Sequence, residues 1–232
     1  MKLFSLIDKA IFEYNLIESG DRILIGASGG KDSTALIEYF SERMKRPNPG
    51  FTFSALNIQT EFSGSLSEEI VSLFKDWNVN LITLKVNMMQ RIREGKKMNC
   101  YWCSTQRRTE LKNYAVANGF NKIALGHHLD DVLETALMNA LNKGELCTMI
   151  PHLKYEKYPV SVIRPLYYCP ESAIIAHTKE RGYNGGTCTC NYQENSARKS
   201  ARQKLECLTD GNPLQKRRLL SALKNVNVRY LP

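Results

Sequence analysis

The apolar positions of the chain follow two spacings that alternate along its length. Short apolar runs rich in β-branched residues predict strands at 22–27, 51–58, 80–86, 122–125 and 160–163. Amphipathic i, i+3, i+4 spacing predicts helices at 33–44, 67–76, 104–118, 130–141, 171–181 and 196–208. Ser67 is the kind of residue that caps a helix N-terminus. The alternation predicts an α/β fold, a doubly wound and Rossmann-like parallel sheet with helices on both faces.

The length of 232 residues fits one domain with a modest appendage. We find no internal repeat and no long linker, so residues 1–195 are expected to form one domain and 196–232 a helical extension of the same compact unit. No segment approaches the roughly 18 consecutive apolar residues of a membrane span, and no signal-peptide pattern opens the chain. We therefore expect a cytoplasmic protein with no membrane partner.

Charge is concentrated in that extension. The formal net charge is +9, from 32 basic and 23 acidic residues. From residue 195 onward, nine basic residues face only Glu206 and Asp210, which gives the extension +7 of the total. The nine are Arg198, Lys199, Arg202, Lys204, Lys216, Arg217, Arg218, Lys224 and Arg229. Such an excess is typical of a surface that neutralises nucleic-acid phosphates, and we assign the extension to nucleic acid in preference to the plain alternative, a solvated basic helix.

A glycine-rich segment with the sequence SGGKDS, residues 28–33, separates the first predicted strand from the helix after it. Paired glycines permit a tight turn with exposed amides, and a helix N-terminus favours an anion. Lys31 adds a positive charge. The segment is not a Walker A loop, because Ile25 occupies the position of the earlier glycine and Asp32 follows the lysine. It predicts a phosphate-binding loop of another type.

A second polar segment, GHHLDDVLET at 126–135, follows the fourth predicted strand. Asp130 and Glu134 share a helix face, so their charges repel unless a cation or a basic group lies between them. Acids at a helix start also complement the helix dipole, but that explains one acid more easily than three. We favour a Mg²⁺ ion that bridges nucleotide phosphates and carboxylates, with Asp32 and either Asp130 or Asp131 as ligands.

The seven cysteines form two close groups and three single residues. Cys100 and Cys103 form a C-x-x-C pair in a predicted loop, and Cys188 and Cys190 form a distant C-x-C pair. In a cytosolic chain such pairs favour metal binding or catalysis over disulfides. Four thiolates suit zinc, whereas three suit an iron–sulfur cluster with one open iron, and the residues alone do not choose. We interpret the remaining thiols as buried small apolar side chains: Cys147, Cys169 and Cys207.

Together, these motifs resemble a known family. In order, the chain carries Lys9–Ala10, IESGDR, SGGKDS, C-x-x-C, GHHLDDVLET, IRPLYYC and C-x-C. Their order and spacing resemble those of the tRNA 2-thiocytidine synthetases and tRNA 2-thiouridine synthetases of the PP-loop ATP pyrophosphatase superfamily. The resemblance covers residues 8–206 and implies an adenine nucleotide α hydrolase-like fold.

The resemblance implies ATP-dependent thiolation of a tRNA pyrimidine. In that reaction the C2 oxygen of the base attacks the α-phosphate, pyrophosphate leaves, and sulfur then replaces the adenylated oxygen. The implied ATP contacts are Ala27, Ser28, Gly29, Gly30, Lys31, Asp32, Ser33, Asn57, Gly126 and His127. The implied catalytic residues are Lys31, Arg107 and Asp130, with Asp32 and Asp131 on magnesium.

The same resemblance implies a [4Fe–4S] cluster on three cysteines, with sulfide at the free iron. Cys100 and Cys103 match two of the ligands. Counting forward from IRPLYYC favours Cys188 as the third ligand, whereas counting back from Arg198 favours Cys190. A persulfide carrier or sulfide would donate the sulfur, and a homodimer is possible by analogy.

The chain departs from the family pattern at several points. Its C-x-C stands where the thiocytidine branch has C-x-x-C, and its tail is short. Gln59 replaces an acidic residue that often ends the second strand, and Arg107 replaces a lysine that the thiouridine branch has near the reacting base. The chain lacks the zinc-ribbon cysteines of that branch, so we predict a cytidine in the anticodon loop as the target. The alternatives are a 2-thiouridine synthetase, a lysidine-type or amidating ligase without a cluster, and a zinc-stabilised RNA-binding module without thiolase activity.

Overall fold

The computed structural model describes residues 2–92, 100–183 and 197–230. Its strands are β1 Asp21–Gly26, β2 Phe51–Gln59, β3 Leu81–Lys85, β4 Lys122–Ala124, β5 His152–Lys154 and β6 Ser161–Ile163. Its α-helices are α1 Leu3–Glu13, α2 Lys31–Met44, α3 Glu68–Asp76, α4 Cys100–Ala117, α5 Leu129–Lys143, α6 Glu171–Arg181, α7 Ala197–Thr209 and α8 Pro213–Lys224. Short 3-10 segments are η1 Met89–Arg91, η2 Pro165–Tyr168 and η4 Val228–Tyr230.

The strands form one six-stranded sheet in the order β3-β2-β1-β4-β6-β5. All neighbouring pairs are parallel except β5 with β6, which is antiparallel. The doubly wound fold predicted from the sequence is therefore confirmed, with an added antiparallel edge strand. From β1 the chain adds β2 and β3 on one side and then β4 on the other, so the strand order reverses between β1 and β4. Open parallel sheets bind ligands at the carboxyl ends of the strands at such a switch point.

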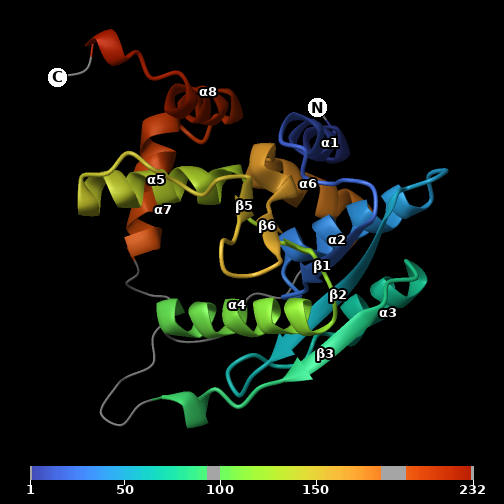
Figure 1. Ribbon diagram of the computed structural model, residues 1–232. Helices are drawn as coiled ribbons and strands as arrows, with labels where there is room; N and C mark the ends of the chain where they lie inside the picture. The colour runs from blue at the N-terminus through green and yellow to red at the C-terminus, as the bar shows by residue number, and fades with distance from the viewer. Residues whose placement is uncertain (1, 93–99, 184–196, 231–232) are drawn as a thin grey trace.

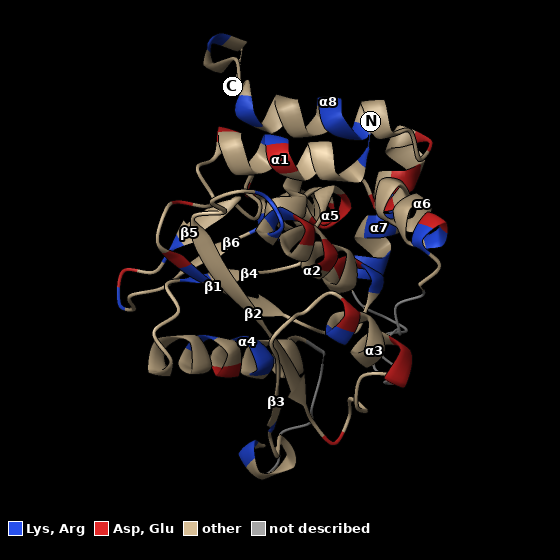
Figure 2. Cartoon of the chain, turned by 90° about the vertical axis from the view of Figure 1, so that its right-hand side faces the viewer, with Lys and Arg blue, Asp and Glu red and all other residues tan. Residues whose placement is uncertain are grey.

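Alternate strand residues supply two separate cores. Ile23 and Ile25 of β1 point into a large core shared with α1, α2, α3, α5 and α6, whereas Leu24 points to the other face. There Leu111 and Ala115 of α4 cover a smaller core. The two views in Figures 1 and 2 show α4 alone on this side of the sheet and the other helices opposite it.

Two elements were not predicted from the sequence. The first is α1, whose buried face includes Leu3, Leu6, Ile7 and Ala10. The second is β5, whose three residues are too few to show a strand period. The capping role predicted for Ser67 is confirmed, since its side chain accepts a hydrogen bond from the Ile70 amide.

The basic extension forms α7 and α8, which pack on the body of the protein. Leu205 and Leu220 are buried in the same large core as α1 and α5. Figure 1 shows α7 crossing α5 and α8 lying above it. Among the described residues, no helix is both long enough and apolar enough to cross a membrane.

A buried carboxylate ties α2 to the end of α6. Glu38 is 3% exposed, accepts hydrogen bonds from Tyr183 at 2.7 Å and His177 at 2.7 Å, and forms an ion pair with Arg181. Burial raises the pKa of Glu38, but these three partners outweigh it and hold the pKa below its usual value. The carboxylate is therefore charged and satisfied inside the fold.

Candidate active site at the carboxyl edge of the sheet

The glycine loop forms an open cradle between β1 and α2. Gly29 has a φ of +79°, and a Cβ at this position would lie 2.7 Å from the Leu66 side chain. A hydrogen bond between the hydroxyls of Ser28 and Ser33, 3.0 Å apart, joins the two ends of the loop. Because α2 begins at Lys31, its unpaired first-turn amides and its dipole point into the cradle. The loop is therefore built to receive an anion, as its sequence predicted.

Asn57 fixes the start of this loop to the neighbouring strand. Its amide nitrogen donates to the Ala27 carbonyl at 2.7 Å, and the Ala27 amide donates to Leu56 of β2. The Asn57 side-chain oxygen is buried and has no hydrogen-bond partner among the described residues. This residue therefore has a spare acceptor at the point where β1 ends.

A cavity of about 700 Å³ lies at the ends of β2 and β3. Gln59, Glu61 and Asn87 are among its lining residues. Glu61 lies two residues beyond Gln59 and accepts hydrogen bonds from the amides of Met88 and Met89. Gln59 replaces the acidic residue that often ends this strand in the family, but Glu61 supplies a carboxylate to the same cavity.

The second polar segment packs directly against the phosphate loop. A Cβ on Gly126 would lie 3.2 Å from the Ser33 amide nitrogen and 3.3 Å from the Asp32 carbonyl carbon. Glycine therefore allows β4 and α2 to approach closely. Burial lowers the pKa of the adjacent His127 to about 4, and the charges of Arg164, Arg198 and Arg108 act in the same direction. His127 is therefore neutral at pH 7.

His128 lies among three carboxylates and is 2% exposed. Its ring nitrogens are 3.6 Å from Asp131, 3.7 Å from Asp130 and 3.9 Å from Asp32. The His128 amide also donates to Asp131 at 3.1 Å, which caps the start of α5. His128 was not among the predicted site residues, yet it lies within 4 Å of acids from both motifs.

Asp130 is occupied by protein partners. One of its oxygens accepts a hydrogen bond from Lys216 of α8 at 2.7 Å, and the other accepts from the Glu171 amide at 2.8 Å. Asp130 is 3% exposed and Lys216 is 6% exposed, so this is a buried ion pair. The catalytic role of Asp130 stays a prediction. Because both of its oxygens already accept hydrogen bonds from the protein, Asp131 is the better candidate of the two to bind magnesium together with Asp32.

Glu171 is a site residue that the sequence reasoning missed. Its carboxylate lies 2.9 Å from the Lys31 ammonium, which also lies 3.2 Å from Asp32. Burial lowers the pKa of Lys31, but the hydrogen bond to Glu171 and the charge of Asp32 raise it overall. The signal was available, because Glu171 opens a helix that follows a parallel strand ending at the same edge.

Arginines of the extension neutralise the acidic face of α5. Arg202 lies 2.7 Å from Glu134, which is fully buried, and Arg198 lies 3.0 Å from Asp131. Burial raises the pKa of Glu134 although Arg202 opposes it. For Asp131 burial also raises the pKa, but the charge of His128 helps to lower it overall. Basic groups thus relieve the repulsion noted in the sequence.

These contacts correct the assignment of the whole extension to nucleic acid. Four of its nine basic residues form ion pairs with acids of the protein: Arg198, Arg202, Lys216 and Lys224. Figure 2 marks the Lys and Arg positions along α7 and α8 in blue. Part of the +7 charge of the extension therefore stabilises the fold through ion pairs. The sequence could not show these pairs, because their partners lie far apart along the chain.

The C-x-x-C pair does not lie in a loop, as predicted, but in the first turn of α4. The helix begins at Cys100, four residues before the start predicted at position 104. Positions 100, 103 and 107 are three and four residues apart, so they share a face of α4. Cys103 is half-buried and forms no disulfide, and the half-buried Arg107 has an unpartnered Nε within the described chain.

Cys188 and Cys190 lie outside the described residues. Among the residues that are described, no three metal-ligating side chains gather closely enough to hold an ion by themselves. Cys169 is buried as predicted, and burial raises the pKa of its thiol. Cys147 and Cys207 are exposed, contrary to prediction, because they lie after α5 and on the outer side of α7.

A phosphate cradle at the switch point of a parallel sheet, with a second acidic helix start packed on it, defines a nucleotide-binding α/β protein of the ATP pyrophosphatase type. The chain belongs to the PP-loop domain family, whose model matches residues 5–207. That match confirms the resemblance found in the sequence.

Two curated relatives illustrate the similarity. The tRNA-cytidine(32) 2-sulfurtransferase of Citrifermentans bemidjiense is 34% identical over 230 residues, which cover 97% of this chain and 90% of the relative. The enzyme of the same name from Cupriavidus metallidurans is 32% identical and covers 99% of this chain and 74% of the relative. These relatives are named as tRNA sulfurtransferases, the enzyme class predicted from the sequence.

Solved structures show the same fold. The U34-tRNA thiolase NcsA from Methanococcus maripaludis with its [4Fe-4S] cluster superposes with a TM-score of 0.79 at 20% identity, over 99% of this chain and 80% of that chain. The NH3-dependent NAD synthetase from Campylobacter jejuni has a TM-score of 0.52 at 15% identity, over 97% and 91% of the two chains.

Proposed function

We propose that this chain is an ATP-dependent tRNA sulfurtransferase that replaces the C2 oxygen of an anticodon-loop cytidine with sulfur. One observation carries the proposal: the phosphate loop and the GHHLDD segment meet at Gly126, where an added Cβ would lie within 3.4 Å of the backbone in the first turn of α2. A nucleotide phosphate in the cradle would then lie beside carboxylates from both motifs. The relatives named as tRNA-cytidine(32) 2-sulfurtransferases support the substrate class and the base.

The loop residues would bind the phosphates of ATP, and the cavity at the ends of β2 and β3 would hold its nucleoside. Lys31 lies at the first turn of α2, where it can neutralise phosphate charge. Asp32 and Asp131 lie on either side of His128, and two carboxylates plus phosphate oxygens are the usual protein environment of Mg²⁺.

The reaction would proceed in two displacements. The C2 oxygen of the base attacks the α-phosphate of ATP, a new oxygen–phosphorus bond forms, and pyrophosphate leaves. A sulfur nucleophile then bonds to C2, and the carbon–oxygen bond breaks as AMP departs with the former base oxygen. Lys31 and the amides of the loop would stabilise the charge that develops on the phosphates. Arg107, which shares a face of α4 with the cysteines, would contact the base or the adenylate.

A [4Fe–4S] cluster would bind Cys100, Cys103 and either Cys188 or Cys190. Helix positions 100 and 103 share a face, and the Cys103 thiol is free, so these residues suit two such ligands. Held by these three cysteines, such a cluster would supply sulfur to the second displacement. As the sulfur donor we propose sulfide, or a persulfide carrier together with a thiol that reduces the S–S bond. We also propose a cytoplasmic location and a homodimer as the working form.

Mass spectrometry of tRNA nucleosides tests the activity. A host lacking this protein should lack 2-thiocytidine, and the wild-type chain should restore it. Lys31→Ala should fail to restore it, whereas Lys75→Ala on the exposed side of α3 should succeed. Restoration of 2-thiouridine instead of 2-thiocytidine would refute the choice of base. Full thiolation by Lys31→Ala would refute the role of the loop.

Anaerobic purification tests the cluster separately. The wild-type protein should be brown with broad visible absorbance, and Cys103→Ala should be colourless. Cys207→Ala is the matched control, because this thiol is exposed on α7 and has no role in the site. A colourless wild-type protein with stoichiometric zinc would refute the cluster and favour a zinc-stabilised RNA-binding module.

A further inference from the structure

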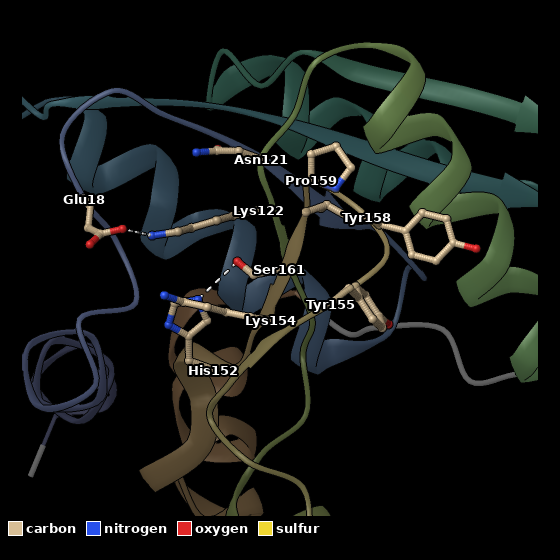
Figure 3. A pocket seen from close by; sticks show the side chains of 10 residues that line it. Glu18, Asn121, Lys122, His152, Lys154, Tyr155, Tyr158, Pro159 and Ser161 are labelled. Atoms are coloured by element: carbon tan, nitrogen blue, oxygen red, sulfur yellow. Dashed lines mark hydrogen bonds and ion pairs between the residues drawn. The ribbon is translucent and has the colours of Figure 1, made fainter.

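A second cavity lies at the edge of the sheet opposite the phosphate loop. It has a volume of about 250 Å³ and is lined by the start of β4, the start of β6 and the β5–β6 hairpin. Figure 3 shows Lys122, His152 and Ser161 in its interior and Tyr155 and Tyr158 on the hairpin. None of these residues takes part in the site described above.

The interior of this cavity is polar but nearly neutral. Lys122 is neutralised by Asp21 at 2.7 Å and Glu18 at 3.0 Å. His152 lies 3.1 Å from the Ser161 hydroxyl, and burial together with the charges of Lys122 and Lys154 lowers its pKa. The interior therefore offers hydrogen-bonding groups suited to a sugar or a base edge, without a strong charge of its own.

The rim adds aromatic rings and unpaired cations. Tyr155 and Tyr158 stand edge to face with ring centroids 6.1 Å apart. Lys154 and Lys157 are exposed and form no ion pair within the described chain, and the one acid between them is Glu156. Aromatic faces beside lysines are the pattern by which proteins bind single-stranded nucleic acid.

Helix α4 connects this cavity to the reaction site. The Lys112 ammonium lies 3.5 Å from the centroid of the Tyr158 ring. One helical turn earlier is the exposed Arg108, whose charge lowers the pKa of both His127 and Arg164 at the site. Tyr101, which is 77% exposed, precedes Lys112 by eleven residues, or about 16 Å along the helix. Neither Arg108 nor Lys112 forms an ion pair with an acid among the described residues.

We propose that the exposed side of α4 and this cavity form one track for the tRNA strand that flanks the target base. The cations of Arg108, Lys112 and Lys154 would contact phosphates along the track, and Tyr158 would stack on a base at its end. The inference rests on the proposed function, because it takes tRNA as the ligand. It adds a second point of attachment, on the far edge of the sheet from the chemistry.

Binding of an unmodified tRNA transcript, measured by filter retention over a range of salt, tests the track. The double variant Lys112→Ala, Lys154→Ala should bind about tenfold more weakly near physiological salt, and the slope of log K against log salt should fall by about 1.5. Lys75→Ala on the opposite face of the sheet should leave both values unchanged. ATP affinity, measured by calorimetry on the same proteins, should be unaffected and will confirm that they fold.

Substitutions of Tyr158 separate stacking from charge. Tyr158→Ala should weaken tRNA binding about fivefold or more without changing the salt slope, whereas Tyr158→Phe should bind as the wild type does. Wild-type affinity and slope in the double lysine variant would overturn the track and leave the proposed function standing. Failure of the wild-type protein itself to bind tRNA would instead overturn the proposed function.

Discussion

Removing one partner of the ion pair between Lys216 and Asp130 should strongly destabilise this fold. Both side chains are almost fully buried, and their charged atoms are 2.7 Å apart. Lys216→Met removes the cation and leaves the carboxylate with one hydrogen bond, from the Glu171 amide at 2.8 Å. An unpaired buried charge is the costly outcome of such a change.

The magnitude follows from the burial. Removing one partner of a buried pair costs about 3–5 kcal/mol, and the remaining amide bond puts this case near the lower end. With a urea m-value of about 3 kcal/mol/M for a chain of this size, the midpoint should fall by roughly 1 M. Lys204→Met, an exposed lysine on α7, should change stability by less than about 0.5 kcal/mol.

The assay is urea unfolding of the cluster-free protein, followed by circular dichroism, with Asp130→Asn added to form a double-mutant cycle. Asparagine can still accept the Glu171 amide without carrying a charge, so Asp130→Asn should rescue part of the loss in Lys216→Met. The double variant should therefore be more stable than Lys216→Met alone. Additive losses from the two substitutions would refute the reasoning, because they would show that the two charges are not coupled.

Three further predictions use other contacts. The pKa of Glu38 in the folded protein lies below its usual 4.5, so the charged carboxylate stabilises the fold above pH 4.5 and this stabilisation is lost as the pH falls through the lowered pKa. The free energy of unfolding of Glu38→Gln, measured in urea, should therefore depend less on pH in this acidic range than that of the wild type. An equal pH dependence in the two proteins would contradict this prediction. Gly29→Ala should abolish ATP binding in calorimetry, because its Cβ would clash with Leu66, whereas Lys75→Ala on the exposed side of α3 should not; ATP binding by Gly29→Ala equal to that of the wild type would exclude the cradle. Glu171→Gln should tighten ATP binding about two- to fivefold by freeing Lys31 from a part-exposed ion pair, and weaker binding would mean that Glu171 positions the lysine instead.

The loop and the fold around it could be predicted because their signals are local. The glycines at 29 and 30, the strand before them and the helix after them lie within one stretch of sequence. The position of Gly126 against α2 followed from parallel topology, since carboxyl ends of parallel strands meet at one edge.

Other parts of the site depend on distant pairing that no local pattern reveals. The sequence shows Lys216 and Arg202 as members of a basic run, and only the fold brings them to Asp130 and Glu134. Glu171 also reaches Lys31 from a separate helix, but its position at a helix start after a parallel strand was a usable signal in the sequence. The helix at Leu3–Glu13 is different, because its apolar spacing was visible in the sequence.

Helix α4 is anchored at one end only. Leu111 and Ala115 are buried in the smaller core, whereas no described residue from 101 to 110 is fully buried. The helix is therefore held by packing at its carboxyl half, and its less buried amino half carries Cys103 and Arg107. In the proposed function, substitutions in the amino half of α4 would alter a cluster ligand or a base contact without disturbing the packing of Leu111 and Ala115. The chemistry of this scaffold would then be free to change at little cost to its folding.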